Sequence, residues 1–500
     1  MIYIMLFPIF FPIAAGLFLL FMKEPEDRKV LIGITGTALA ITGVSATYAL
    51  FHVNGEAILL FHFTVTLPIY FKPDNIGILF AAVVTVIWVL AGFFSFSYME
   101  TGHGKGEAGE KRFYGFYLMV FGILLGLNFA GNMITFYVFY ELMTLLSMPL
   151  VIHTRSREAV MAALKYMFYS FCGAYMALFG LYFLYRFGNT LTFTAGGVLD
   201  KSMLPGNENL LLVAVFIMIL GFGVKSGMFP LHAWLPTAHP VAPAPASAVL
   251  SAVIVKGGVL GMIRVVYYMF GADFIRGTWV QTVWLTLTLI TIFMGSMLAY
   301  REKVLKKRLA YSTVSQVSYI LFGLALLQPI ALEGAFLHVV YHAFVKCALF
   351  LVAGAVIHKT GKVKVDDLTG IGKEMPVTMW CFTFASLALI GIPPTGGFIS
   401  KWYLALGALE SGEGIFCLLG PVILLISALL TAGYLLPLTI KGFFPGDGYC
   451  YPEQNPLNRK KETSLYMLAP IAILAILAVA LGVAPNLLIR YISGIVSEVL

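Results

Sequence analysis

The chain has 500 residues, of which 60% are hydrophobic and 11% are charged, and its formal net charge is +8. Soluble globular domains carry about 25% charged residues, so this composition excludes a soluble protein. The positive charge does not indicate nucleic-acid binding, because most lysines and arginines lie in the expected loops on one side of a membrane. The five cysteines are scattered singly and give no spacing typical of a cluster or zinc site, so we expect no cofactor and no metal.

Long apolar runs predict an all-α polytopic membrane protein. At roughly 20 residues per span plus short loops, this length accommodates about 14 transmembrane helices. The first run lacks a basic region and a small-residue cleavage site, so we expect a retained span rather than a signal peptide. Glycine and proline interrupt the seventh and twelfth runs, which we expect to be discontinuous helices. The predicted spans are 2–22, 30–50, 76–98, 113–130, 132–152, 162–185, 210–238, 246–270, 279–299, 309–328, 332–357, 376–410, 416–440 and 464–488.

The distribution of basic residues predicts the orientation of the chain. Most lysines and arginines lie in the loops that follow odd-numbered spans. Because cytoplasmic loops carry the excess of positive charge, we expect these loops in the cytoplasm and both termini on the outer side. The count on the side of the even-numbered loops is only Lys72, Arg186, Lys201, Arg276 and, near the end of the eighth span, Arg264.

Spacing between the two interrupted spans predicts an internal repeat. Lys225 and Lys401 lie 176 residues apart, one in each interrupted span. Adding 176 to the position of Glu141 gives a position within the polar run 311–319. Adding 176 to the position of Lys256 gives the residue before Gly433. Five spans per unit would make the second copy inverted in the membrane. The predicted organisation is an N-terminal three-helix segment (1–112), a first five-helix repeat of spans 4–8 (113–270), a second repeat of spans 9–13 (271–441) and a C-terminal helix (442–500).

Two opposite charges lie within predicted spans of the first repeat. Lys225 ends a long apolar run, and Pro230 follows five residues later and breaks the helix. A lysine at this depth costs several kcal/mol on insertion scales, so it points to an ion or proton pathway. Glu141 is the acidic residue most clearly placed in mid-span. It could be a structural ion pair between helices, but we favour a proton carrier or a movable partner that controls the proton of Lys225.

The second cluster of ionisable residues has helical spacing. His338, His342 and Lys346 are four residues apart, which places them on one face of a helix. Two histidines at this spacing can form half of a metal site, but no carboxylate or cysteine completes it. We therefore favour a proton relay, which suits histidine because its charge changes near neutral pH. Lys256 lies between apolar residues and two glycines, where it could also snorkel to a surface.

Three further polar residues are possible accessory members of this pathway. His232 follows the break at Pro230, where it could cap a water-filled cavity or belong to a rigid turn. Ser312 and Ser315 lie in the polar run 311–319. They could order a chain of water molecules, or simply pack helices together.

Several runs resemble a known family. They read KSGMFPLHAWLP at 225–236, PASAVL at 245–250 and RLAYSTVSQ at 308–316, and the segments 338–346 and 391–401 agree with them. These motifs resemble the antiporter-like subunit family shared by respiratory complex I, Mrp-type sodium/proton antiporters and membrane-bound hydrogenases. The resemblance covers roughly residues 75–440.

The resemblance implies a 14-helix fold with inverted five-helix repeats, in the membrane of a prokaryotic cell, assembled with other integral membrane subunits. It implies that Glu141 is the charge partner of Lys225 and that Lys256 is the central lysine. His338 and His342 match the bridge between half-channels, and Lys401 matches the residue on the exit side. Some relatives have glutamate at this last position. The lysine, and the end of the chain soon after its last span, resemble the D-type subunits of Mrp antiporters most.

We therefore expect a proton-translocating subunit in which a proton passes from Lys225 through Lys256 and the two histidines to Lys401. The alternatives are a sodium-translocating subunit, the membrane subunit of a quinone or NADH-type oxidoreductase, and a passive scaffold. Glycines at 102–106 and 221–223 do not lie in a strand–turn–helix unit, so redox chemistry would belong to partner subunits. The excess of buried lysine over buried acid argues against a scaffold.

Overall fold

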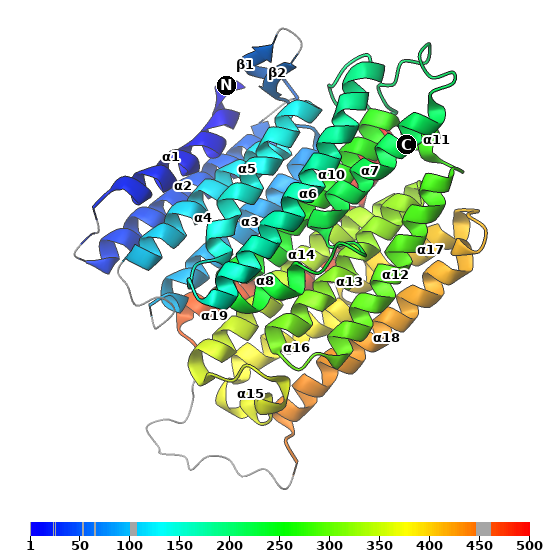
Figure 1. The fold of residues 1–500 in the computed structure, drawn as a ribbon. Coiled ribbons are helices and arrows are strands. Elements are labelled where there is room, and N and C mark those ends of the chain that lie inside the picture. The colour runs from blue at the N-terminus through cyan, green and yellow to red at the C-terminus, as the bar shows by residue number, and fades with distance from the viewer. Residues whose placement is uncertain are drawn as a thin grey trace, which may run out of the picture.

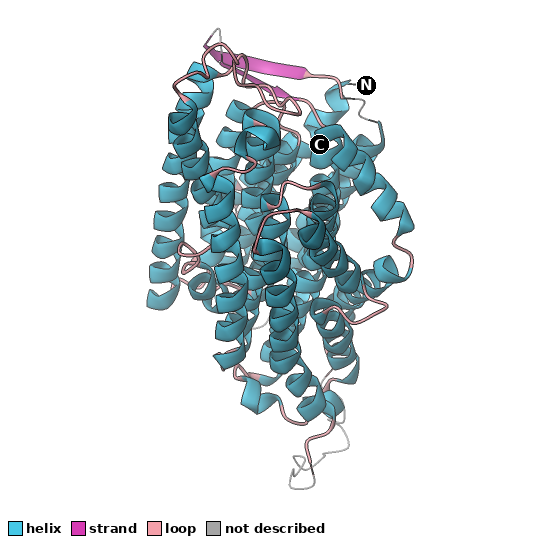
Figure 2. Cartoon of the chain, turned by 90° about the vertical axis from the view of Figure 1, so that its right-hand side faces the viewer, coloured by secondary structure: helices cyan, strands magenta, loops and turns pink. Residues whose placement is uncertain are grey.

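The computed structural model describes residues 2–23, 25, 27–52, 55–64, 67–100, 108–446 and 462–500. The glycines at 102–106 and Cys450 lie outside this part of the chain. The molecule is a bundle in which most of the long helices run in roughly the same direction (Figure 1). A two-stranded antiparallel hairpin and both chain termini lie toward one end of this bundle (Figure 2).

The helices follow the predicted spans in order. In the N-terminal part they are α1 (Phe7–Phe21), α2 (Arg28–His52), α3 (Asn75–Tyr98), α4 (Ala108–Asn128), α5 (Met133–Val151), α6 (Arg157–Phe187), α7 (Glu208–Ser226) and α8 (Leu235–Val241). The central ones are α9 (Ala244–Val249), α10 (Val255–Ile263), α11 (Ala272–Ile275), α12 (Trp279–Arg301), α13 (Leu305–Ala325) and α14 (Pro329–Thr360). The remainder are α15 (Ile371–Glu374), α16 (Pro376–Ile390), α17 (Gly396–Glu410), α18 (Phe416–Phe443), α19 (Leu465–Val483) and α20 (Asn486–Val499).

Eleven helices in the described part of the chain are long and apolar enough to cross a membrane. The chain is thus a multi-pass membrane protein, as the composition predicted. The α4 and α13 helices are not among the eleven. Each begins with basic residues, as Lys111 and Lys306 illustrate, and these lower its hydropathy. The α16 and α17 helices are each 15 residues long, which is too short to span alone.

Both predicted interruptions coincide with helix ends. The α7 helix ends at Gly227 and α16 ends at Gly391, and both glycines adopt left-handed backbone angles. Lys225 comes two residues before its glycine, whereas Lys401 comes ten residues after the other. An offset of 176 residues, which superposes the two lysines, therefore does not superpose the two breaks.

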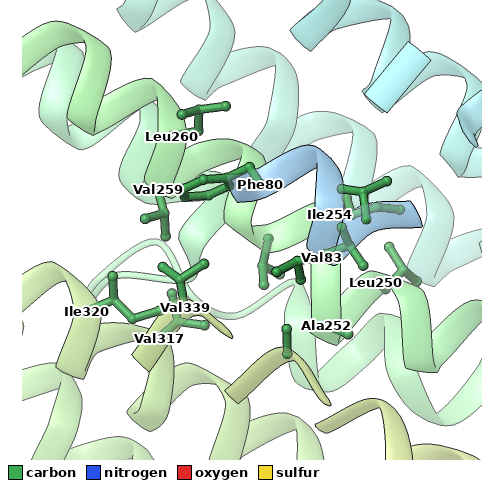
Figure 3. Packing of buried hydrophobic residues seen from close by; sticks show 14 of the residues in the cluster. Phe80, Val83, Leu250, Ala252, Ile254, Val259, Leu260, Val317, Ile320 and Val339 are labelled. Atoms are coloured by element: carbon green, nitrogen blue, oxygen red, sulfur yellow. The ribbon is translucent and has the colours of Figure 1, made fainter. Parts of the chain in front are cut away.

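The segment from Ala244 to Phe270 forms the centre of the bundle. It contains α9 and α10, with π-helical turns at η2 (Leu250–Ile254) and η3 (Arg264–Phe270), and every residue of its apolar window is buried. Figure 3 shows its side chains packed against α3, α13 and α14. Such π-turns occur frequently at functional sites.

Two elements were not predicted from the sequence. Strands β1 (Ile58–Thr64) and β2 (Leu67–Phe71) form the hairpin in what we expected to be a loop. The last predicted span, 464–488, extends too far, because its helix ends at Val483 near Pro485, and proline disfavours a helical conformation in the residue before it. The amphipathic α20 then begins and buries one apolar face, which consists of Ile492, Ile495, Val496 and Val499.

An ion pair between the buried Arg264 and Asp74, whose side chain is 32% exposed, connects the centre of the bundle to the start of α3. Arg264 is 1% exposed, and its guanidinium donates to both carboxylate oxygens of Asp74. The guanidinium also packs against the rings of Phe193 and Tyr268, with its Cζ atom 4.5 and 4.9 Å from their centroids. Asp74 also accepts from the backbone N–H of Gly77 at 2.9 Å and so caps α3. Burial raises the pKa of the Asp74 carboxyl, but the charge and hydrogen bonds of Arg264 outweigh burial and hold it below its ordinary value.

We predict that Asp74→Ala lowers the free energy of unfolding by about 3 kcal/mol, because it leaves a buried guanidinium without its counter-charge. Thermal unfolding of the purified protein in detergent measures this change. Since the pKa of Asp74 is lowered on folding, its stabilising contribution is present above about pH 4 and lost in more acidic solution. Asp273→Ala is the control, because Asp273 is 97% exposed in its pair with Arg276. Equal effects of the two substitutions would contradict the prediction.

Candidate functional site

Lys225 lies at the C-terminal end of α7 and is completely buried. Its ammonium group donates to three hydroxyl groups contributed by α5 and α6. The distances from Nζ are 2.7 Å to Thr144 Oγ1, 2.9 Å to Tyr166 OH and 3.2 Å to Ser170 Oγ. Nζ also lies 4.5 Å from the ring centroid of Tyr166. The lysine is therefore held by neutral oxygens and an aromatic ring, which together stabilise a buried cation.

Glu141 lies on α5, one turn before Thr144, and is partly exposed. Its Oε1 atom is buried and makes no hydrogen bond. Among the described residues no ion pair joins Glu141 to Lys225. The structure thus places Glu141 on α5 and Lys225 on α7 without an ion pair between them.

Lys256 lies on α10, directly after the π-turn, and is 1% exposed. Its Nζ donates to the carbonyl of Ala252 at 2.6 Å and lies 2.9 Å from Nδ1 of His342. A protonated lysine can only donate, so His342 Nδ1 must then be the acceptor and Nε2 must carry the ring proton. That Nε2 atom is buried and has no partner. The snorkelling alternative for Lys256 is therefore wrong.

The row continues through α14 to the second helix break. The rings of His342 and His338 stack with centroids 5.8 Å apart, and His338 Nδ1 lies 2.9 Å from Ser400 Oγ. Ser400 immediately precedes Lys401 on α17. The ammonium of Lys401 donates to the carbonyls of Leu389 and Ile390 at 2.6 and 2.8 Å. These carbonyls end α16, where they lack helical partners.

Lys225 and Lys256 lie on helices that pack closely together, α7 and α10. A Cβ added at Gly258 would lie 2.5 Å from the carbonyl oxygen of Phe222, 2.6 Å from Ser226 Oγ and 3.0 Å from Lys225 Cβ. Only glycine fits there. The six residues predicted as a relay therefore lie on contacting helices, with Lys256 and His342 in direct contact.

The accessory residues are distributed differently. Lys346 is buried and donates to the carbonyl of Leu309 at 3.1 Å. Ser312 bonds to Tyr434 at 2.6 Å. Ser315 bonds to Ser296 at 2.8 Å, so both serines connect α13 to neighbouring helices. The contacts of Ser312 and Ser315 agree with the alternative in which these serines pack helices together. His232 is partly exposed, and its Nδ1 is buried without a partner.

Sequence reasoning missed several polar residues of this site. Thr144, Tyr166 and Ser170 hold Lys225 but are ordinary residues in apolar runs, so no local signal identifies them. Ser400 could have been noticed as the neighbour of Lys401. Lys306 was counted as a loop charge, but it is 6% exposed and donates to the carbonyl of Ala242 at 2.8 Å. Within the described ranges, no group of three or more histidine, cysteine or acidic side chains could hold a metal ion.

Comparison with known proteins shows extensive similarity. The family profile described as NADH:quinone oxidoreductase/Mrp antiporter, transmembrane, matches residues 130–427. NADH-quinone oxidoreductase subunit N of Desulforudis audaxviator is 32% identical, over 96% of this chain and 95% of the relative. The D subunit of the Na(+)/H(+) antiporter from Bacillus subtilis is 29% identical, over 97% and 94%. A chain of the membrane-bound sulfane sulfur reductase, an archaeal respiratory membrane complex, has the same fold, with a TM-score of 0.85, 22% identity and coverage of 99% and 97%.

We predict that Gly258→Ala separates α7 from α10 and lowers stability by about 1–3 kcal/mol, as is typical of overpacking. The matched control is Gly257→Ala, whose new Cβ would lie closest to the flexible end of Met143 at 2.9 Å. The midpoint temperature of thermal unfolding should fall in the first variant and stay nearly unchanged in the second. Similar behaviour of the two variants would show that the contact with Phe222 and Ser226 does not control this packing.

Proposed function

Because the chain belongs to the NADH:quinone oxidoreductase/Mrp antiporter transmembrane family, we propose that it is a proton-translocating antiporter-like subunit of a multisubunit membrane complex. The observation that carries this proposal is the direct contact between Lys256 and His342 within a buried row of ionisable groups. In that contact an ammonium group meets a ring nitrogen that can accept its proton, which is the arrangement a proton transfer requires.

The proposed path begins at Lys225 and ends at Lys401. A proton leaving Lys256 passes to His342 Nδ1, and the opposite nitrogen of that ring can release a proton toward His338. His338 contacts Ser400, which immediately precedes Lys401, so we place the last transfer of the path between His338 and Lys401. Between Lys225 and Lys256 the close contact of α7 with α10 sets the route.

Glu141 is the proposed control point. Its open arrangement leaves a carboxylate oxygen without a partner while the ammonium of Lys225 is held by hydroxyl groups. Movement of the carboxylate toward Lys225 would favour the charged amine, and movement away would favour loss of its proton. A neighbouring protein that displaces Glu141 would thereby couple its own reaction to this path.

The row of lysines favours protons over sodium as the ion that is moved. Hard cations bind several oxygen ligands, and carboxylates supply most of them. Lys225, Lys256 and Lys401 would instead repel a sodium ion along the same route. Where relatives take part in quinone or NADH oxidation, as their names say, we place the redox step in partner subunits and the membrane pathway in this chain.

The finer organisation of the fold is also part of this proposal. We propose fourteen spans, with spans 4–8 and 9–13 as inverted repeats between the segments 1–112 and 442–500. The α7–α8 and α16–α17 breaks occupy corresponding places in the order of helices, which supports the repeat. We also propose that both termini face outward. The α15 helix, with Lys373, and the C-terminal end of α18, with Lys441, lie at the end of the bundle opposite the hairpin, and this end would face the cytoplasm (Figure 1).

We predict that Lys225→Ala abolishes proton uptake by membrane vesicles that contain the whole complex, because alanine cannot carry a proton at the start of the row. A pH-sensitive dye measures uptake, and the amounts of the assembled complex are matched between samples. Lys201→Ala is the control, since Lys201 is exposed in a loop. Unchanged proton uptake with loss of sodium transport would favour the sodium alternative instead.

A further inference from the structure

The α1 and α2 helices lie at one edge of the bundle, and each is packed closely on a different neighbour (Figure 1). On α1, a Cβ added at Gly16 would lie 2.4 Å from the carbonyl oxygen of Gly115 on α4. On α2, a Cβ added at Gly43 would lie 3.0 Å from Cγ2 of Val89 on α3. Because α1 follows α4 and α2 follows α3, the two helices leave room between them.

A first hollow occupies this room, with a volume of about 770 Å³. One wall consists of Ile4, on the 3₁₀ turn η1 (Ile2–Leu6), and Phe7 at the start of α1. The opposite wall is formed by Ile41, Val44 and Tyr48 of α2. Volumes of this size are typical of pockets that hold organic ligands.

A second hollow of about 450 Å³ adjoins the first and is lined by Thr47 and Phe51 of α2. The Thr47 hydroxyl donates to the carbonyl of Gly43 at 2.8 Å, so it presents little polarity to the hollow. Val44 and Tyr48 line both hollows. They are one helical turn apart, so they form a ridge that separates the two hollows.

The position of the ridge along α2 places both hollows at membrane depth. The α2 helix has 25 residues, from Arg28 to His52, and the ridge lies in its second half. A helix of this length extends about 37 Å, whereas the hydrocarbon core is about 30 Å thick. The hollows therefore face the hydrocarbon of the leaflet on the side of the hairpin, which begins at Ile58. Water does not fill apolar space of this kind, whereas acyl chains can.

A polar group ends the ridge at the surface of the same leaflet. His52, the last residue of α2, is exposed, and its ring stacks on that of Tyr48 with the centroids 4.0 Å apart. Its Nδ1 atom lies 2.9 Å from the carbonyl oxygen of Tyr48. A carbonyl only accepts, so Nδ1 must carry the proton, and Nε2 remains for contact with a headgroup. Amphipathic aromatic rings are enriched at this depth, where hydrocarbon meets headgroups.

We propose that one diacyl phospholipid of the hairpin-side leaflet binds at this site, with an acyl chain in each hollow, the ridge of Val44 and Tyr48 between the chains, and the headgroup at His52. The two hollows decide in favour of this occupant. A transmembrane helix is a convex cylinder about 10 Å across and would rest on the ridge without entering both hollows. A lipid with a single chain would fill only one of them.

The number of phospholipid molecules retained by the purified whole complex tests the site. Val44→Trp should block it, because Val44 lines both hollows. Val422→Trp is the matched control, since Val422 is a 51% exposed valine on another helix, α18. After extensive washing in detergent, native mass spectrometry counts the lipids and the protein subunits of each complex. We expect the wild type and Val422→Trp to retain one phospholipid more than Val44→Trp.

Two results of this count would overturn the inference. Equal numbers of phospholipids in all three complexes would show that the hollows hold no bound lipid. Loss of a protein subunit from Val44→Trp, with the lipid count unchanged, would show that a helix of another subunit covers this surface. The midpoint of thermal unfolding should be the same in both tryptophan variants, which separates a blocked site from a misfolded chain.

A second measurement needs no substitution. The wild-type complex, stripped of lipid by detergent, is titrated with diacyl phosphatidylethanolamine or with its lyso form, which has one acyl chain, and binding is followed by native mass spectrometry. We expect the diacyl lipid to bind roughly tenfold more tightly or better, because its second chain contributes its own buried methylene groups. Equal affinities of the two lipids would contradict the inference that both hollows belong to one site.

Discussion

Lysine ammonium groups are buried in this bundle without carboxylate partners, and the fold must satisfy each of them. Lys225, Lys256, Lys306 and Lys346 are buried, Lys401 is partly buried, and among the described residues none of the five forms an ion pair. An unpaired buried charge costs several kcal/mol unless hydrogen bonds replace its water. Every one of these groups donates to hydroxyl or carbonyl oxygens. Neutral acceptors stabilise a cation less than a carboxylate would.

Irregular backbone supplies many of these acceptors. A regular helix uses its carbonyls internally, so free carbonyls occur where a helix ends or changes its hydrogen-bonding pattern. Lys401 bonds to the end of α16, Lys306 bonds to the residue that ends α8, and Lys256 bonds to Ala252 within the π-turn. Lys225 differs, because the hydroxyl groups of α5 and α6 surround it. The breaks and the charges are therefore mutually dependent: broken helices in a membrane need donors, and buried lysines need acceptors.

The ionisable row was predictable because a charge within an apolar run is visible in sequence, and the spacing of His338 and His342 is helical. The hydrogen-bond partners of Lys225 were not predictable from the sequence. Thr144 and Ser170 lie 81 and 55 residues away from it, and only the fold brings them near. Lys306 was misplaced for a similar reason: its position beside basic neighbours suggested a loop, but α13 already begins at Leu305. The hairpin and α20 were missed because short amphipathic elements do not produce the long apolar signal of a span.

The hydrogen bonds of Lys401 are matched in number to a neutral amine. An ammonium group has three N–H donors, and an amine that has lost its proton keeps two. Lys401 donates to two carbonyls, those of Leu389 and Ile390. Discharge of one proton therefore leaves both carbonyls at the end of α16 satisfied, and the break can keep its shape while the charge changes. The backbone geometry at the end of α16 therefore does not depend on whether Lys401 is charged.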